Sequence, residues 1–407
     1  MNKKKILVVC PGPIYPIKMG SQVRMFEIVK GLSLDHEVDV IAKVPGKKYL
    51  SSEYSDPIRN ICNEYSPVIA PNKENNIKRS FYKVGFWFEN KVRLTPANLF
   101  YFSNTGLAQR IAGIANSKKY DIINCEYWYS CSLYRHLKYR PYFALDTHDI
   151  NFEKYEMDQR YKGQWRQNLG KIEKYKNLEL EHTGLNDLII SVSESDLESF
   201  KGIFPEKSHI KIPIGQDLSA YLDYSPLSDD SKNILFYGSM GSAQNVKAFF
   251  RLFHDIFPGI KSKIPDTKLI VLGANPPEEI KSLHDGKNIH VLGYVEDVRE
   301  CIPKAKIMIL PMDIAGGFRT RVVEVMAMGV PVIGTHNALD SIEMTSGVHG
   351  YITDSEDEMA ERAVLLLNDP ELRIRMSEEC RLFVAEKYTI DATYGKLSKY
   401  YMNLGLQ

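Results

Sequence analysis

The sequence predicts an α/β protein built from two doubly wound domains that face a central cleft. Two observations lead to this prediction. In both halves, short apolar runs rich in β-branched residues alternate with longer helix-like stretches, the pattern of parallel strands covered by helices on both faces. The chain also has 407 residues, more than one ordinary core accommodates. In such sheets, ligands are expected at the carboxyl ends of the strands.

A polar stretch with prolines and an Asp-Asp-Ser run interrupts this alternation. It spans residues 206–232, and its composition is typical of a linker. We therefore predict an N-terminal domain over residues 1–205 and a C-terminal domain over residues 233–387. A last helix, over about 388–407, is expected to pack back on the N-terminal domain.

The N-terminal domain is expected to contain five strands and two helical stretches. Val23, Phe26 and Val29 recur at helical spacing after the first loop. The polar stretch Phe152–Glu181 is expected to be helical, with its charges on a solvated face. The expected strands are Ile6–Val9, Glu37–Ala42, Asp121–Cys125, Tyr142–Leu145 and Leu188–Val192.

The C-terminal domain repeats this alternation, beginning with a strand over Ile234–Gly238. Further strands are expected over Leu269–Leu272, Ile289–Leu292, Ile307–Leu310 and Val332–Gly334. Helices are expected over about Val246–Ile264, Glu356–Leu367, Glu371–Lys387 and Asp391–Asn403.

The composition favours a soluble, cytoplasmic protein. The formal net charge is +1, and no run of 18 apolar residues occurs, so neither a polyelectrolyte binder nor a membrane span is expected. The cysteines form no C-x-x-C pair, which argues against a zinc site and a disulfide framework. They are Cys10, Cys62, Cys125, Cys131, Cys301 and Cys380.

The most informative stretch runs from Ile307 to Thr335 and reads IMILPMDIAGGFRTRVVEVMAMGVPVIGT. A buried strand ends at Pro311, and a glycine-containing loop leads into a helix near Thr320 or Arg321. Gly329 is well placed to end that helix. The stretch therefore presents a helix N-terminus at the carboxyl end of a strand.

This arrangement predicts an anion site. A helix N-terminus presents unpaired amides and a partial positive charge, and Gly316 and Gly317 let the backbone approach a ligand closely. Arg319 and Arg321 add charge that suits phosphate. Glu324, one turn into the helix, could reach ribose hydroxyls. The alternative is an ordinary strand–helix turn with a surface pair of arginines.

At this point the residues resemble a known family. The order of strand, glycine-rich loop, Arg, Glu and A-M-A-x-G-x-P-V-I resembles the family-4 retaining glycosyltransferases of the GT-B fold (glycosyl transferases group 1). The similarity extends through Ile234–Met312 and is close to a subgroup found in polysaccharide biosynthesis. Looser matches in the first half are Pro11–Gly20, the DHEVDV strand, Asp146–Asp149, Val192–Asp196 and Pro213–Asp217.

The resemblance implies two Rossmann-like domains, a retaining transfer of a hexose-type sugar and no metal. The sugar would come from a UDP- or GDP-linked donor and pass to a glycan, lipid-linked or other acceptor. His148 and Arg319 would be catalytic. Donor-binding positions carried over by the resemblance or placed at the same loops are Gly20, Gly238, Ser239, Asn245, Tyr294, Val295, Gly316, Gly317, Phe318, Arg319, Thr320, Arg321 and Glu324.

The sequence also departs from the family. Members usually carry two glutamates spaced E-x7-E; Glu324 matches the second, and Gly316 replaces the first. Ser239 and Gln244 stand where many members place Arg and Lys on the donor phosphates. We therefore expect Arg319 and Arg321 to neutralise the phosphates instead.

His148 follows an apolar strand and matches the family histidine near the donor sugar. The alternative is a loop histidine satisfied by Asp146 or Asp149. These three residues, together with Glu126, could also be imagined as a metal site, but their spacing defines no geometry, and we predict no metal.

Three further positions have two interpretations each. Gly20 lies where the family loop packs against the donor phosphates, but Ser21 beside it could simply cap a helix. Asn245 could donate to a phosphate or cap the next helix. Residues 73–94 interleave basic and aromatic side chains, as at a membrane surface, although the aromatics could pack on the core. Nucleic acid is not expected as a partner.

The sequence is also compatible with two other functions. A nucleotide-sugar epimerase could use the same architecture, but it would need acidic and histidine residues around the sugar that the sequence does not supply. The missing glutamate at Gly316 is compatible with a non-catalytic subunit of a glycosyltransferase complex.

Overall fold

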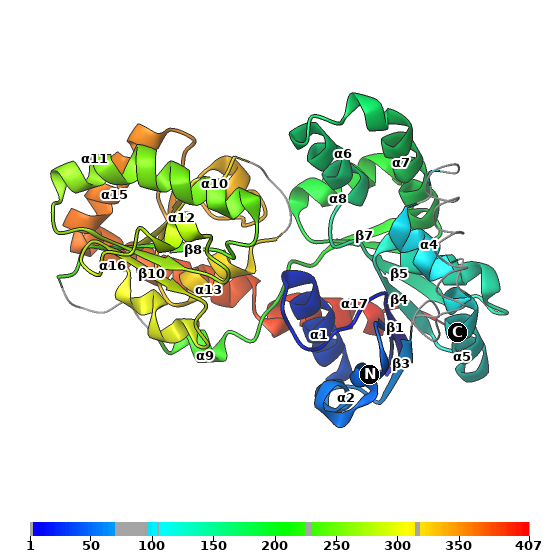
Figure 1. The fold of residues 1–407 in the computed structure, drawn as a ribbon. Helices are drawn as coiled ribbons and strands as arrows, with labels where there is room; N and C mark the ends of the chain where they lie inside the picture. The colour runs from blue at the N-terminus through cyan, green and yellow to red at the C-terminus, as the bar shows by residue number, and fades with distance from the viewer. Residues whose placement is uncertain are drawn as a thin grey trace. The chain divides into compact units, whose positions relative to one another are not determined.

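The computed structural model describes residues 3–69, 94, 96–103, 106–224, 230–313 and 318–406. The chain forms two compact units. The first contains residues Met1–Gln216 and Ile390–Gln407, and the second contains Asp217–Thr389. Figure 1 shows that each unit is a sheet with helices packed against it.

The first unit is built on a parallel sheet of seven strands, in the order β3-β2-β1-β4-β5-β6-β7. The strand order reverses between β1 and β4, as in other doubly wound sheets. The strands are β1 (Lys5–Cys10), β2 (Glu37–Val44), β3 (Glu64–Ile69), β4 (Ile122–Glu126), β5 (Tyr142–Asp146), β6 (Leu188–Ser191) and β7 (Ser208–Lys211).

Helices of the first unit come from both ends of the chain. They are α1 (Gly20–Ser33), α2 (Ser52–Arg59), α4 (Ala97–Ser103), α5 (Leu107–Lys118), α6 (Asn151–Tyr161), α7 (Leu169–Thr183), α8 (Glu194–Ile203) and α17 (Lys396–Met402). The central strands are apolar on both faces because helices cover both, and Ile6, Leu7, Val8 and Val9 of β1 are fully buried.

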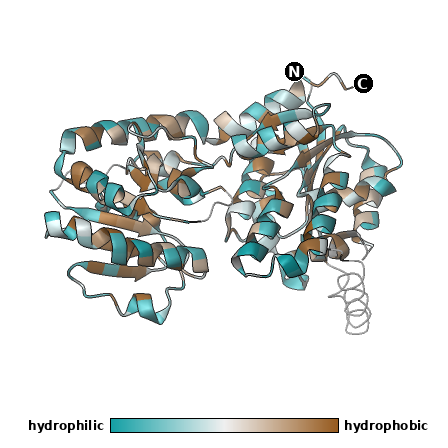
Figure 2. Ribbon diagram, turned by 90° about the horizontal axis from the view of Figure 1, so that it is seen from above, coloured by the Kyte–Doolittle hydropathy of each residue, from teal (hydrophilic) through white to brown (hydrophobic). Residues whose placement is uncertain are grey.

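The second unit repeats the plan with a parallel sheet of six strands, in the order β10-β9-β8-β11-β12-β13. The order reverses between β8 and β11. The strands are β8 (Asn233–Tyr237), β9 (Lys268–Leu272), β10 (Ile289–Gly293), β11 (Ile307–Leu310), β12 (Val332–Gly334) and β13 (Gly350–Ile352). Figure 2 shows hydrophobic residues concentrated along the strands, with polar positions on the surrounding helices.

Helices of the second unit are α9 (Ser219–Leu222), α10 (Ala243–Arg251), α11 (Phe257–Lys263), α12 (Glu278–Lys281), α13 (Thr320–Ala327), α14 (His336–Leu339), α15 (Glu356–Asn368) and α16 (Pro370–Lys387). A π-helical turn, Leu252–Ile256, joins α10 to α11. The predicted helix over 246–264 is therefore one continuous helical segment with a π-helical turn in its middle. In the described part of the chain, no helix is both long and apolar enough to cross a membrane.

The predicted doubly wound α/β fold is confirmed, and all ten predicted strands are present. The sequence missed β3, β7 and β13, each of which lies at the edge of its sheet. Edge strands are only partly covered and need not be apolar, so the apolar runs that revealed the central strands are absent from them. The predicted helix over 152–181 is divided into α6 and α7, because Gly163 has a left-handed φ of +66°. The predicted linker over 206–232 contains β7 and α9.

The last segment of the chain belongs to the first unit. Residues 391–395 form a π-helical turn that leads into α17, and both pack beside α1 (Figure 1). Gly31 makes this approach possible, because a Cβ at this position would lie 2.5 Å from the Cβ of Tyr394. All six cysteines are free.

Replacing Gly31 by alanine should therefore destabilise the first unit, although alanine favours helices. We expect a loss of about 1–3 kcal/mol from overpacking. The matched control is Gly113→Ala in α5, where no atom lies within 4 Å of the added methyl group, and which should raise stability by about 0.4–1 kcal/mol. Urea unfolding followed by circular dichroism measures both. Equal effects of the two substitutions would show that the segment at Tyr394 does not pack on α1.

Candidate functional site

In the second unit, the candidate site lies at the carboxyl ends of β8 and β11, where the strand order reverses. α13 begins at Thr320, and the side chain of its N-cap residue Arg319 makes no capping hydrogen bond. Gly329 follows the helix with a left-handed φ of +72°, as expected for a helix-ending glycine. Gly316 and Gly317 lie outside the described residues. The expected helix N-terminus at the carboxyl end of β11 is therefore present.

The two arginines of this loop differ in their surroundings. Arg319 precedes α13, and its guanidinium donates to the carbonyls of Ala338 at 2.8 Å and Asn337 at 3.0 Å. Its neighbour Phe318 contacts the ring of Tyr388, with centroids 5.5 Å apart. Arg319 thus holds the loop against the chain near α14.

Arg321 instead points to the loop after β8. Its Nη2 donates to Oδ1 of Asn245 at 2.9 Å, and Asn245 in turn donates to the carbonyl of Ser239 at 2.7 Å. Gly238 leaves room for this contact, because a Cβ there would lie 2.7 Å from Arg321 Nη1. Asn245 therefore does not cap α10; it joins the two loops that end β8 and β11.

The charge of Arg321 is poorly compensated. Its Nε is buried without a hydrogen-bond partner, and within the described ranges no carboxylate forms an ion pair with it. Burial and the nearby charge of Arg319 lower the pKa of Arg321 to about 10, so it stays protonated at neutral pH. A buried cation without an anionic partner is costly, and a bound anion would remove that cost.

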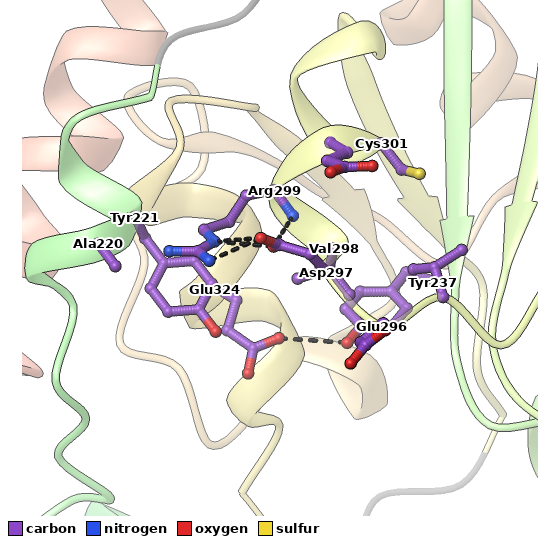
Figure 3. Close-up of a pocket in the computed structure, with 11 residues that line it drawn as sticks. Ala220, Tyr221, Tyr237, Glu296, Asp297, Val298, Arg299, Cys301 and Glu324 are labelled. Atoms are coloured by element: carbon purple, nitrogen blue, oxygen red, sulfur yellow. Dashed lines mark hydrogen bonds and ion pairs between the residues drawn. The ribbon is translucent and has the colours of Figure 1, made fainter.

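A pocket of about 890 Å³ lies next to this cluster. Glu324 forms part of its wall, and Tyr237 donates a hydrogen bond to Glu324 Oε2 at 3.3 Å (Figure 3). Burial raises the pKa of Glu324. Arg299 also lines the pocket and is paired with Asp297 at 2.6 Å.

The remaining predicted positions in this unit have different exposures. Val295 lines the pocket, whereas Tyr294 is 74% exposed. Ser239 is exposed beside buried Gly238. The sequence analysis missed Tyr237 and Arg299. Tyr237 ends the strand that precedes Gly238, and its position at a strand's carboxyl end was the signal that could have revealed it.

In the first unit, His148 lies in a buried polar cluster after β5. It is 6% exposed, and its Nε2 lies 2.7 Å from Oε2 of Glu126 at the end of β4. Its ring stacks on Tyr127 with centroids 4.0 Å apart. His148 and Tyr127 both have left-handed φ values, +62° and +65°. Such backbone is uncommon outside glycine and often marks a functional site.

A buried ion pair lies beside this contact. Arg24 of α1 donates through Nε to both carboxylate oxygens of Asp146, at 2.9 and 2.8 Å, and all of these side chains are buried. Possible metal-ligand atoms of Glu126, Asp146 and His148 lie within 4.8 Å of one another. Because the guanidinium already occupies Asp146, we assign no metal to this group.

Comparison with known proteins finds a family match within the second unit. Residues 231–369 match the family model described as glycosyl transferases group 1. The matched residues contain the Arg321–Asn245 cluster and most of the Glu324 pocket.

The chain is also similar to named proteins. It is 24% identical over 200 residues to N-acetyl-alpha-D-glucosaminyl L-malate synthase of Bacillus anthracis, a match that covers 47% of this chain and 50% of that protein. The chain thus spans about half the length of this relative. The predicted class of the protein, a glycosyltransferase, agrees with both matches.

Solved structures extend the likeness to the whole fold. The sucrose-phosphate synthase of Thermosynechococcus elongatus has a TM-score of 0.70 at 15% identity, with 99% of each chain covered. Anabaena HepE in complex with UDP and glucose has a TM-score of 0.63 at 13% identity, with 98% of this chain and 100% of that chain covered. The predicted resemblance to GT-B glycosyltransferases is confirmed, whereas the polysaccharide subgroup stays a prediction.

Two predicted interactions differ in the structure. Ser21 does not cap α1, because the helix begins at Gly20 and its N-cap position is Met19. His148 is satisfied by neither Asp146 nor Asp149: its partner is Glu126, and Asp149 pairs with Lys154 at 2.7 Å. Apart from Leu94, the predicted membrane-contact segment 73–94 lies outside the residues that the structure describes.

The first unit should have a distinctive pH dependence, because the pKa of Glu126 is raised and that of His148 is lowered. Burial raises the pKa of Glu126 to about 8 and lowers that of His148 to about 4. Between these values the folded pair keeps the Glu126 proton. The unfolded chain, with a histidine pKa of about 6.5, has lost both protons above that pH. The folded state then binds more protons, so stability should fall as pH rises from about 6.5 to 8.

The expected loss across this interval is about 1–2 kcal/mol. Glu126→Gln lacks this carboxyl group and should lose about 1–2 kcal/mol less over the same interval. Glu179, whose pKa burial also raises to about 8, contributes equally to both proteins. Urea unfolding midpoints at pH 6.5, 7.25 and 8 measure the difference between the two proteins. Parallel profiles would contradict a protonated Glu126 in the folded protein.

Proposed function

We propose that this protein is a glycosyltransferase that takes a sugar from a nucleoside-diphosphate donor and attaches it to a hydroxyl group of an acceptor. The observation that carries this proposal is Arg321. It is a partly buried cation, with its Nε fully buried and no carboxylate partner among the described residues, at the N-terminus of α13 and close to a pocket large enough for a nucleoside.

The charges of this unit favour one orientation of the donor. The pocket wall carries Glu296, Asp297, Glu300 and Glu324 against one cation, Arg299. A diphosphate would be repelled there, whereas a neutral base and ribose would be tolerated. The diphosphate would lie at Arg321 and the first turn of α13, with Glu324 accepting hydrogen bonds from ribose hydroxyls.

The same groups would assist the chemistry. When the bond between the sugar's anomeric carbon and the phosphate oxygen breaks, negative charge grows on the diphosphate. A preorganised guanidinium and helix amides stabilise that charge in the transition state. We infer a retaining transfer, in which the acceptor hydroxyl attacks from the face of the departing phosphate and gives that phosphate its proton. No metal is required in this scheme.

UDP is the first nucleotide to test, because the structure of Anabaena HepE contains UDP. The proposal also includes a hexose-type sugar and a glycan, lipid-linked or other acceptor. It further includes a role in polysaccharide biosynthesis and membrane contact by residues 73–94. The substitution of the first family glutamate by Gly316 keeps a non-catalytic subunit as the competing function.

Replacing Arg321 by methionine should separate binding from folding. Loss of a charged phosphate contact should weaken UDP binding at least about tenfold. Stability without nucleotide should change by less than about 1 kcal/mol, because an uncompensated buried charge is removed along with its hydrogen bonds. Calorimetry with UDP and GDP and thermal unfolding measure the two effects.

The matched control is Arg375→Met, which removes an exposed arginine of α16 and should leave binding unchanged. Unweakened UDP binding by Arg321→Met would contradict the assigned phosphate site. If the unaltered protein bound neither UDP nor GDP, the non-catalytic function would be favoured. Conversion of a nucleotide sugar without any acceptor would indicate an epimerase.

A further inference from the structure

A chain of buried hydrogen bonds runs from the last helix of the protein to His148. The hydroxyl of Tyr401 in α17 donates to Oδ1 of Asn124 at 2.6 Å. Nδ2 of Asn124 donates to Oε1 of Glu126 at 2.9 Å. Oε2 of Glu126 then meets Nε2 of His148 at 2.7 Å. Segments 277 residues apart in sequence thus meet below one histidine.

The direction of this chain follows from the chemistry of its members. Because the Tyr401 hydroxyl occupies the amide oxygen of Asn124, the amide NH₂ group faces Glu126. An NH₂ group only donates, so Glu126 Oε1 must accept. If Glu126 carries a proton, that proton can lie only on Oε2, where it points at His148. All four side chains are 6% exposed or less, so little water competes for these positions.

Burial and the neighbouring charges decide whether Glu126 carries that proton. Arg24 donates through Nε to Asp146. Burial disfavours a carboxylate at Glu126 and an imidazolium at His148 alike. It outweighs the opposing effect of Arg24 on Glu126 and of Asp146 on His148, so both side chains are neutral.

We propose that Glu126 is a positioning residue that holds His148 as the neutral tautomer with its proton on Nδ1. The carboxylic acid donates from Oε2 to Nε2, so Nε2 is an acceptor and the remaining ring proton lies on Nδ1. His148 therefore acts as a hydrogen-bond donor through Nδ1 and not as a base. Tyr401 and Asn124 fix which Glu126 oxygen holds the proton.

Only the catalytic role of the oriented His148 rests on the proposed function, since the tautomer itself is a property of the folded chain. Oriented imidazoles commonly owe their tautomer to the partner of the other ring nitrogen. The left-handed backbone at His148 and Tyr127, together with their stacking, fixes the ring plane. The hydrogen bond from Glu126 then fixes which ring nitrogen of His148 donates.

The titratable groups around the pair come from several elements of the first unit. They are Cys10 of β1, Arg24 of α1, Asp146 of β5, Tyr127 after β4, Asp149 and Lys154 near the start of α6, and Tyr394 and Tyr401 of the C-terminal segment.

Nitrogen NMR of full-length protein labelled with ¹⁵N-histidine tests the proposal. The His148→Asn variant identifies the His148 ring signals by their loss. At pH 6.5 to 7, we expect Nδ1 to carry the proton and Nε2 to be bare. Glu126→Gln should give the same tautomer, because its amide NH₂ also donates to Nε2. Glu126→Leu removes the donor and should shift the ring to the Nε2 tautomer.

A second measurement does not depend on the leucine variant folding. As pH rises through about 8, where Glu126 loses its proton, the unaltered protein should convert to the Nε2 tautomer, because a carboxylate only accepts. Glu126→Gln should not convert. A Nε2 tautomer at pH 6.5 in the unaltered protein, or conversion in Glu126→Gln, would overturn the proposal.

Transfer activity adds a readout that separates this inference from the proposed function. Glu126→Gln should keep turnover within about tenfold, whereas Glu126→Leu should lose about 100-fold or more, in the range of a lost catalytic hydrogen bond. Equal turnover in the two variants would overturn the role in catalysis. A confirmed tautomer in a protein that binds no nucleotide would leave the positioning intact and reject the transferase.

Discussion

A guanidinium that leaves water needs an anionic partner, and the two units of this protein meet that need in opposite ways. In the first unit, Arg24 is fully buried and pairs with Asp146. In the second unit, the hydrogen-bond partners of Arg321 among the residues that the structure describes are an amide and a thioether. The first arginine is therefore part of the folded core. The second has an incomplete environment that a ligand would complete, and the proposed diphosphate site follows from that difference.

Arg24 also determines the chemistry around His148. Burial raises the pKa of Glu126, and the guanidinium that could favour its carboxylate form is paired with Asp146 instead. That acid faces the histidine, and its other oxygen is held by Asn124. A structural ion pair thus controls the protonation of the one histidine that the family resemblance singles out. Removing a charge from this cluster would alter His148 without touching it.

Close backbone approaches bring these groups together. Gly31 allows the C-terminal segment to lie against α1, and so lets Tyr401 reach Asn124 of β4. Gly238 allows the Arg321 guanidinium to reach the loop after β8. At both positions a side chain would occupy space that a functional neighbour needs. Packing therefore requires glycine at both positions. The site depends on the space that these glycines leave, not on a hydrogen bond or charge that they supply.

The sequence by itself determined the two parallel sheets and the helix N-terminus at Thr320, because buried strands and helix ends leave local apolar and glycine patterns. It also predicted Arg321, Glu324 and His148 as candidate site residues. Only the tertiary structure decided their partners. Asn245 of α10 and Tyr237 of β8 meet Arg321 and Glu324 of α13. Tyr401 and Glu126 reach His148 from distant segments. Local patterns cannot reveal such contacts, because they depend on which strand ends lie side by side when the sheet is assembled.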